Sequence, residues 1–148
     1  MSTASAWSVA LNGIEGAMVE VEVAEGGGLP RTVLVGLPDA ALSQAKERVR
    51  AAVTGAELPW PNGLVTINLS PANLPKTGTH YDLAIATAAL AAIDKVPKEA
   101  ARNHVCLGEL GLDGRLRRVP GILPALLAAV RSGFDKVIVP ASQEAEAS

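Results

Sequence analysis

The feature that most constrains this chain is the run from Met18 to Val23, in which apolar residues alternate with glutamates. Side chains of a β-strand point to opposite faces of the sheet in turn, so this run predicts a strand with one buried and one wet face. Further strands are predicted at 6–11, 32–35, 64–69, 104–110 and 136–140. We expect the first three strands to form an antiparallel meander, with a turn at Asn12–Gly13 between the first two.

Three segments between these strands have helical spacing. The first follows Pro38 and Asp39, which are typical of a first helical turn, and its charged residues Glu47, Arg48 and Arg50 are expected on the wet face. The second, Tyr81–Ile93, is apolar almost all round and is therefore expected to be buried. The third is 120–131, whereas 97–102 is expected to be a polar connector and Asp113–Gly114 a hairpin tip. The order of elements predicts an α/β (α+β) two-layer sandwich in one domain, 1–148.

Composition narrows the possible functions. The chain is 49% hydrophobic but only 3% aromatic, so its core must be built from Val, Leu, Ile and Ala. The net charge of −2 argues against a globally basic nucleic-acid binder, although a local basic patch remains possible. No apolar run approaches the ~20 residues of a membrane span, so we expect a cytoplasmic protein without membrane contact. The single cysteine, Cys106, is expected to be a buried small apolar residue.

Motifs for cofactor chemistry are absent from the sequence. There is no phosphate-binding loop of the Gly-x-x-x-x-Gly-Lys type and no Gly-x-Ser-x-Gly nucleophile turn. His80 and His104 are 24 residues apart, so a metal site could form only by long-range assembly, and none is expected. We therefore expect neither catalytic residues nor a bound cofactor in this chain. The tail 141–148 begins like a helix that stops, as at the end of a segment of a longer protein.

The loop before the second helix contains the first group of candidate binding residues. Backbone N–H groups at a helix N-terminus attract anions, and a lysine and two hydroxyls stand beside them here. The candidates for an anion or DNA-backbone contact are Lys76, Thr77, Gly78, Thr79 and His80. The alternative is structural: Thr79 would cap the helix together with Asp82, Lys76 would be solvated, and His80 would be a capping or loop residue.

The second candidate group is a cluster of arginines around the hairpin tip, Arg115, Arg117 and Arg118. Alternation along the strand places Arg115 and Arg117 on one face, where they could contact nucleic-acid phosphates or another protein module. The alternative is a solvated hairpin edge whose charges discourage strand pairing. Aromatic residues do not interleave with basic ones in the sequence, so a base-stacking platform is not expected.

Three groups of motifs, in this order, resemble the N-terminal domain of the magnesium-chelatase-like AAA+ proteins, the ComM/YifB family. They are Val35–Ala41 with Glu47–Val53, Thr66–Lys76 with Tyr81–Ala86, and Leu107–Arg117. The resemblance implies a fold similar to the proteolytic domain of Lon proteases, which is ribosomal-protein-S5 domain 2-like. It also implies an AAA+ ATPase module after residue 148, which would bind ATP and Mg. The parent would be a hexameric ring that processes DNA during competence as a branch-migration helicase, with this domain docked on its own ATPase module.

Lon-type proteases place a nucleophilic serine in a Pro-Lys-x-Gly-Pro-Ser-Ala-Gly motif, and a lysine on a later helix activates it. By resemblance, His80 stands at the serine position and Leu123 at the lysine position. A leucine cannot accept a proton, so this chain is expected to lack peptidase activity. Two alternatives stay open: a magnesium-chelatase subunit for metal insertion into tetrapyrroles, and a phosphate- or nucleotide-binding module of the GHMP-kinase type, supported only by Gly78.

Overall fold

The computed structural model describes residues 2–12 and 15–147 of the chain. Two long strands, β1 (Ser2–Asn12) and β2 (Glu15–Gly26), form an antiparallel hairpin at the centre of a six-stranded sheet. The sheet continues on one side through β4 (Leu64–Ser70) and β3 (Arg31–Val35), and on the other through β5 (Val105–Cys106) and β8 (Val137–Ile138). The β3–β4, β1–β5 and β5–β8 pairs are parallel, and β2–β4 is antiparallel.

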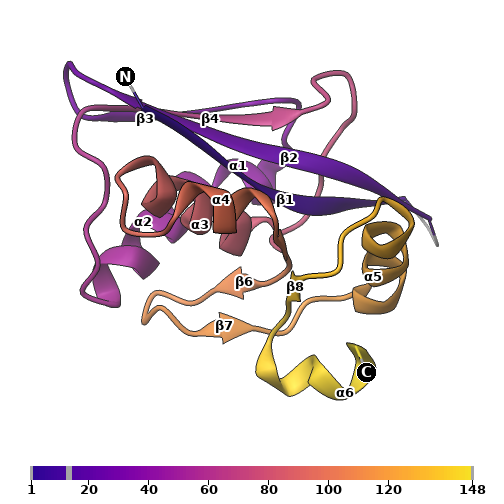
Figure 1. The fold of residues 1–148 in the computed structure, drawn as a ribbon. Coiled ribbons are helices and arrows are strands. Elements are labelled where there is room, and N and C mark those ends of the chain that lie inside the picture. The colour runs from indigo at the N-terminus through magenta and orange to yellow at the C-terminus, as the bar shows by residue number, and fades with distance from the viewer. Residues whose placement is uncertain (1, 13–14, 148) are drawn as a thin grey trace.

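The helices lie on one side of this sheet (Figure 1). They are α1 (Ala40–Ser43), α2 (Ala45–Gly55), α3 (Asp82–Ala92), α4 (Lys98–Arg102) and α5 (Ile122–Arg131), followed by a 3-10 turn (Ala141–Gln143) and α6 (Glu144–Ala147). A separate hairpin of β6 (Glu109–Leu110) and β7 (Leu116–Arg117) lies beneath α3 (Figure 1). The mixed α/β class predicted from the sequence is confirmed. Among the described residues, no helix is both long and apolar enough to cross a membrane.

The buried and exposed faces of β2 are those that the sequence predicts. Val19, Val21 and Val23 are fully buried, whereas Glu22 is exposed. The helix that covers these valines, α3, buries mostly alanines, together with Ile85. Because alanine side chains are short, α3 can lie close to the sheet, and Val, Leu, Ile and Ala supply almost all of the core despite the scarcity of aromatics.

A second, smaller core lies between α5 and the far end of the β1–β2 hairpin. Its buried residues include Val9 and Ile122, and the rings of Trp7 and Phe134 pack at its margin with centroids 5.4 Å apart. The hairpin approaches α5 so closely at Gly16 that a Cβ atom there would lie 2.8 Å from the Cβ of Ala128. Glycine at this position is therefore a packing requirement.

Several local expectations are wrong. The first three strands are not a meander, because β4 lies between β2 and β3, and β3 pairs only with β4. The connector at 97–102 contains α4, and the strand expected at 104–110 is divided into β5 and β6, which belong to different sheets. The single helix expected after Pro38 and Asp39 is divided at Gln44 into α1 and α2. The other expected helices and strands are confirmed within a few residues, and the tail does begin a helix. The turn expected at Asn12–Gly13 falls partly on residue 13, outside the described residues.

Candidate functional site

The candidate loop, residues 71–80, connects β4 to α3 and lies against the loop that leads from β3 into α1. Pro38 and Lys76 form a parallel bridge between the two loops. The backbone N–H of Lys76 donates to the carbonyl of Leu37 at 2.9 Å, and that of Asp39 donates to the carbonyl of Lys76, also at 2.9 Å. The two loops therefore form one ordered structure at the edge of the sheet.

Lys76 is fully buried, so the structural alternative in which its side chain is solvated is wrong. Its Nζ donates to the carbonyl oxygens of Gly36 at 2.6 Å, Leu69 at 3.1 Å and Pro71. These three bonds match the three protons of an ammonium group, and burial lowers the pKa of Lys76. The ammonium thus ties the ends of β3 and β4 to the loop. An anion contact by Lys76 remains a prediction, and it would have to draw the ammonium away from these carbonyls.

The remaining loop residues are arranged around Asp39. Its Oδ1 accepts from the N–H of Leu42 at 2.8 Å, which caps α1, and its Oδ2 accepts from the N–H of Gly78 at 3.2 Å. Gly78 has φ 102°, in the region that favours glycine. Thr77 is exposed and Thr79 is half-buried. The expectation that the Thr79 side chain caps the helix is wrong, because the N-cap residue of α3 is Tyr81, whose side chain makes no capping hydrogen bond. The carbonyl of Thr79 accepts instead from the N–H of Asp82 at 3.3 Å.

His80 is a buried loop residue. Its Nε2 lies 2.6 Å from the carbonyl oxygen of Val9, and since a carbonyl can only accept, Nε2 carries the proton. Burial lowers the pKa of His80 against the opposing effect of this hydrogen bond, so the imidazole is neutral near neutral pH. The ring also packs on that of Tyr81, with centroids 4.2 Å apart. His80 thereby holds the loop to β1.

Arg48 and Asp82 form a buried ion pair that sequence reasoning missed. Arg48 donates from Nε to Oδ2 at 2.6 Å and from Nη2 to Oδ1 at 2.7 Å, and the N–H of Leu110 donates to Oδ2 at 3.0 Å. Asp82 is fully buried and the Arg48 side chain is only 18% exposed, so the expectation of Arg48 on the wet face is wrong. Hydrogen bonding to Asp82 raises the pKa of Arg48. The signal available in the sequence was a lone carboxylate in an otherwise apolar helix, which needs a partner when buried.

The hairpin arginines lie apart from this network. The Arg115 side chain is 89% exposed, with its Nε 3.9 Å from Oδ2 of Asp113. Arg117 is exposed in β7, and Arg118 donates from Nη1 to the carbonyl of Ser142 at 3.0 Å. The structure thus directs Arg118 toward the C-terminal segment. Contacts of these arginines with nucleic acid remain a prediction.

The two residues at the positions matched to the Lon Ser–Lys dyad cannot act as a nucleophile and its base. His80 is buried and bonded to β1, and Leu123 is 58% exposed on α5. One lysine amine does reach a serine hydroxyl, since Nζ of Lys98 lies 2.9 Å from Oγ of Ser2. That contact is at the surface between α4 and β1, where nothing desolvates the amine as a lysine base requires.

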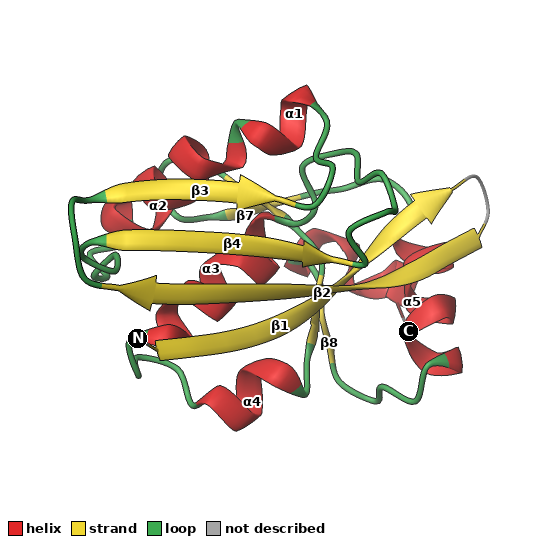
Figure 2. Cartoon of the chain, turned by 90° about the horizontal axis from the view of Figure 1, so that it is seen from above, coloured by secondary structure: helices red, strands yellow, loops and turns green. Residues whose placement is uncertain are grey.

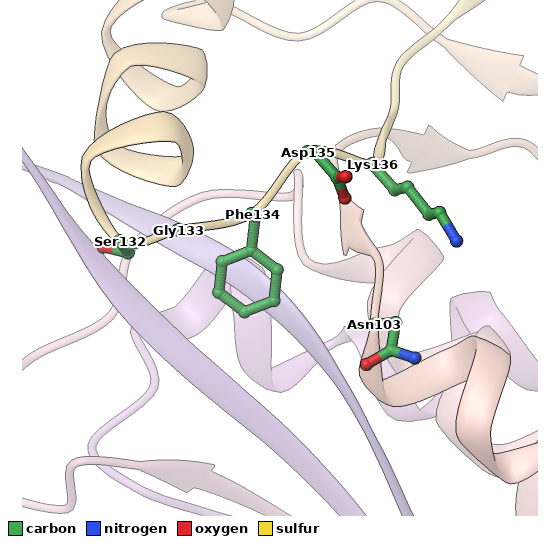
Figure 3. Close-up of a pocket in the computed structure, with 6 residues that line it drawn as sticks. All are labelled: Asn103, Ser132, Gly133, Phe134, Asp135 and Lys136. Carbon is green, nitrogen blue, oxygen red and sulfur yellow. The ribbon is translucent and has the colours of Figure 1, made fainter.

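Two clefts are candidate binding sites, and only the first adjoins the candidate loop. One, of about 340 Å³, lies between the candidate loop and the end of the β1–β2 hairpin and is lined by Ala10, Leu11, Glu15, Gly16, Ala17, Leu74, Pro75 and Thr77. Another, of about 290 Å³, is lined by Asn103 and by Ser132–Lys136 (Figure 3). Figure 3 shows its side chains spread around an open hollow rather than converging on one point. In the described part of the chain, no three His, Cys, Asp or Glu side chains gather as metal ligands.

Comparison with known proteins gives consistent matches. The sequence profile described as "ChlI: Subunit ChlI of Mg-chelatase" matches residues 19–143. An uncharacterized protein of Mycobacterium tuberculosis is 52% identical over 148 residues, 100% of this chain and 29% of its own length. Competence protein ComM of Haemophilus influenzae is 41% identical over 93% of this chain and 27% of its own length. The protein YifB of Escherichia coli is 40% identical over 90% of this chain and 26% of its own length.

Lon proteases match more weakly and over less of the chain. That of Clostridioides difficile is 34% identical over 82 residues, which is 55% of this chain and 10% of the protease. The chain spans less than a third of the length of these mycobacterial, ComM and YifB relatives. The profile, by contrast, covers most of the chain, from the middle of β2 to the 3-10 turn. The chain therefore belongs to the magnesium-chelatase-like family described as subunit ChlI of Mg-chelatase, with ComM and YifB among its relatives.

Proposed function

We propose that this chain is a non-catalytic interaction domain, of the Lon-like, S5 domain 2-like fold, within an AAA+ ATPase that processes DNA. The observation that carries the proposal is the 41% identity to competence protein ComM over 93% of the chain. The partial match to Lon proteases supports the fold assignment. In this proposal, ATP and Mg bind to a separate ATPase module, and the domain docks on that module in a hexameric ring.

The residues at the two Lon positions support a non-catalytic role. A Ser–Lys mechanism needs a hydroxyl to attack and an amine to take its proton. His80 offers a neutral imidazole whose Nε2 proton is held by a carbonyl, and Leu123 offers no proton acceptor. The buried Lys76 cannot replace the missing amine, because its Nζ already faces three carbonyl oxygens.

The proposal is tested on the full-length protein that contains this domain. We expect its ATP hydrolysis to be stimulated by DNA, and we expect ATP-driven migration of a branched DNA substrate. The 148-residue chain alone should neither hydrolyse ATP nor cleave casein. An ATPase indifferent to DNA would refute the DNA-processing role, and casein cleavage by the chain would refute the non-catalytic role.

A second candidate function is supported by the description of the matching profile. Subunit ChlI of Mg-chelatase names a protein of metal insertion, so the parent could instead drive magnesium insertion into a tetrapyrrole. Magnesium insertion into protoporphyrin, assayed with the partner subunits of a chelatase, separates the two functions. Insertion without DNA-stimulated ATP hydrolysis would favour this second candidate.

A further inference from the structure

A cleft at the opposite end of the sheet from the candidate loop brings together two arginines and a tryptophan that are far apart in the sequence. It has a volume of about 280 Å³ and is lined by Pro30, Arg31, Thr32, Arg50, Thr54, Trp60, Pro61, Asn62 and Gly63. Figure 2 shows β3 and β4 beginning at this end, where β2 finishes, with α2 beside them. Its lining contains two arginines, one tryptophan and no acidic side chain.

The two arginines come from different elements and are available to a ligand. Arg31 begins β3, where its N–H donates to the carbonyl of Gly63 at 3.1 Å, and Arg50 is on the exposed face of α2. Both residues are exposed, and in the described part of the chain neither has an ion-pair partner. Guanidinium groups bind phosphate through paired N–H donors, so two of them at one cleft form a natural phosphate site.

Trp60 gives the cleft a flat apolar surface that is held in place. It is half-buried and packs against the main core, between Pro59 and the buried Pro61. Proline fixes its own φ and restricts the residue before it, so the backbone around Trp60 has little freedom to lose on binding. Stacking of a base on an exposed tryptophan face is a common mode of single-strand recognition. Asn62 and Thr32 add polar groups at the rim.

We propose that this cleft binds one nucleotide unit of a single-stranded nucleic acid, with the phosphate on Arg31 and Arg50 and the base on Trp60. The volume, close to the lower end of small-molecule sites at ~300 Å³, suits one nucleotide, and neighbouring nucleotides would run outside along the edge strand β3. The inference rests on the proposed function, for which it supplies a surface that meets DNA. It runs against the expectation that no base-stacking platform exists, because the fold brings Trp60 into one cleft with Arg31 and Arg50.

The test uses the 148-residue chain and a short oligothymidine, which is unlabelled for tryptophan fluorescence and fluorescently labelled for affinity measurements by anisotropy. In a Trp7→Phe background, Trp60 is the only tryptophan, so quenching of its emission reports stacking at the cleft. We expect saturable quenching with the oligonucleotide. Replacing both arginines (Arg31→Gln with Arg50→Gln) should weaken binding about tenfold or more and reduce the slope of log K against log salt by about 1.4. Trp60→Leu should weaken it about tenfold, with the melting temperature measured alongside.

Control variants and competitors separate this cleft from general charge effects. Lys98→Gln with Arg102→Gln removes the same charge from α4 and should leave affinity within about twofold. Unchanged affinity in the Arg31 and Arg50 variant, an equal loss in this control, or no quenching of Trp60 would each overturn the proposal. So would binding of AMP as tight as that of the oligonucleotide, or a preference for duplex. If one of these results were found and DNA still stimulated ATP hydrolysis by the full-length protein, the cleft proposal would fail while the proposed function would stand.

Discussion

Replacing Arg48 by alanine should destabilise the protein far more than replacing Asp82 by asparagine, although both changes break the same ion pair. Arg48→Ala leaves the carboxylate of Asp82 fully buried, with the N–H of Leu110 as its remaining donor. A buried charge that loses its partner costs about 3–5 kcal/mol. A domain of this size has a stability of roughly 5–15 kcal/mol, so the loss is large.

Asp82→Asn is milder for a geometric reason. One oxygen of Asp82, Oδ2, accepts from both Arg48 Nε and the N–H of Leu110. The amide oxygen of asparagine can occupy that place, so the bond from Nη2 to Oδ1 is lost and Nη2 must turn away from the new NH2 donor. The Arg48 side chain is 18% exposed and its guanidinium can turn toward water. We expect a loss of about 1–2 kcal/mol.

The two variants should also differ in their pH dependence. Burial raises the pKa of Asp82, and Arg48 opposes that effect. Without Arg48, the carboxyl can escape its buried charge by taking up a proton, so the deficit of Arg48→Ala should shrink as the pH falls from about 7.5 to about 5.5. Urea unfolding of both variants at the two pH values measures this. Equal losses at the higher pH, or a deficit of Arg48→Ala that grows on acidification, would refute the reasoning.

Three more predictions concern other buried contacts. Lys76→Met should cost about 3 kcal/mol in urea unfolding, because three carbonyls lose their donor, while Lys98→Met at the surface should cost almost nothing. Burial lowers the pKa of His80, so as the pH falls below about 6.5 the imidazole takes up a proton in the unfolded chain and not in the folded one. The free energy of unfolding in urea should therefore fall by up to about 1.4 kcal/mol per pH unit. The fall should be less steep in His80→Gln. Gly16→Ala should lower stability by about 1–3 kcal/mol through overpacking against α5, whereas Gly27→Ala, with nothing within 4 Å, should not; equal melting temperatures for the two would contradict the packing at Gly16.

The sequence was informative where structure is set by neighbours along the chain. Alternation from Met18 to Val23 predicts the buried face of β2, and the apolar character of Tyr81–Ile93 predicts a buried helix. Both patterns record how side chains repeat within one element, and no distant partner is needed to read them. The position of β3 had no such signal, because a strand that pairs with its predecessor has the same local pattern as one that pairs with its successor.

The polar contacts of the candidate site depend on residues far apart in the chain. Arg48 and Asp82 are 34 positions apart, and Lys76 is 40 positions from Gly36. A charged residue in sequence has no mark that distinguishes a wet position from a buried one with a partner. The sequence therefore identified the loop 76–80 as unusual but misplaced its lysine in solvent, and it missed the cleft that gathers Arg31, Arg50 and Trp60.

The hydrogen bonds of Lys76, His80 and Asp82 hold the loop before α3, and the start of α3 itself, to several other elements. Lys76, His80 and Asp82 lie in the segment that the resemblance aligns with the nucleophile motif of Lon-type proteases. Each is bonded to a different element: Lys76 to β4 and the preceding loops, His80 to β1, and Asp82 to α2 and β6. A catalytic serine must present an accessible hydroxyl, whereas the residue at the aligned position, His80, is buried and bonded to β1. The three contacts fix the segment from three sides. Under the proposed function this rigidity is expected, because a domain that positions other groups gains from a stiff loop. Loosening it, as in Lys76→Met, should then reduce the DNA-stimulated ATPase of the parent only to the extent that the domain unfolds.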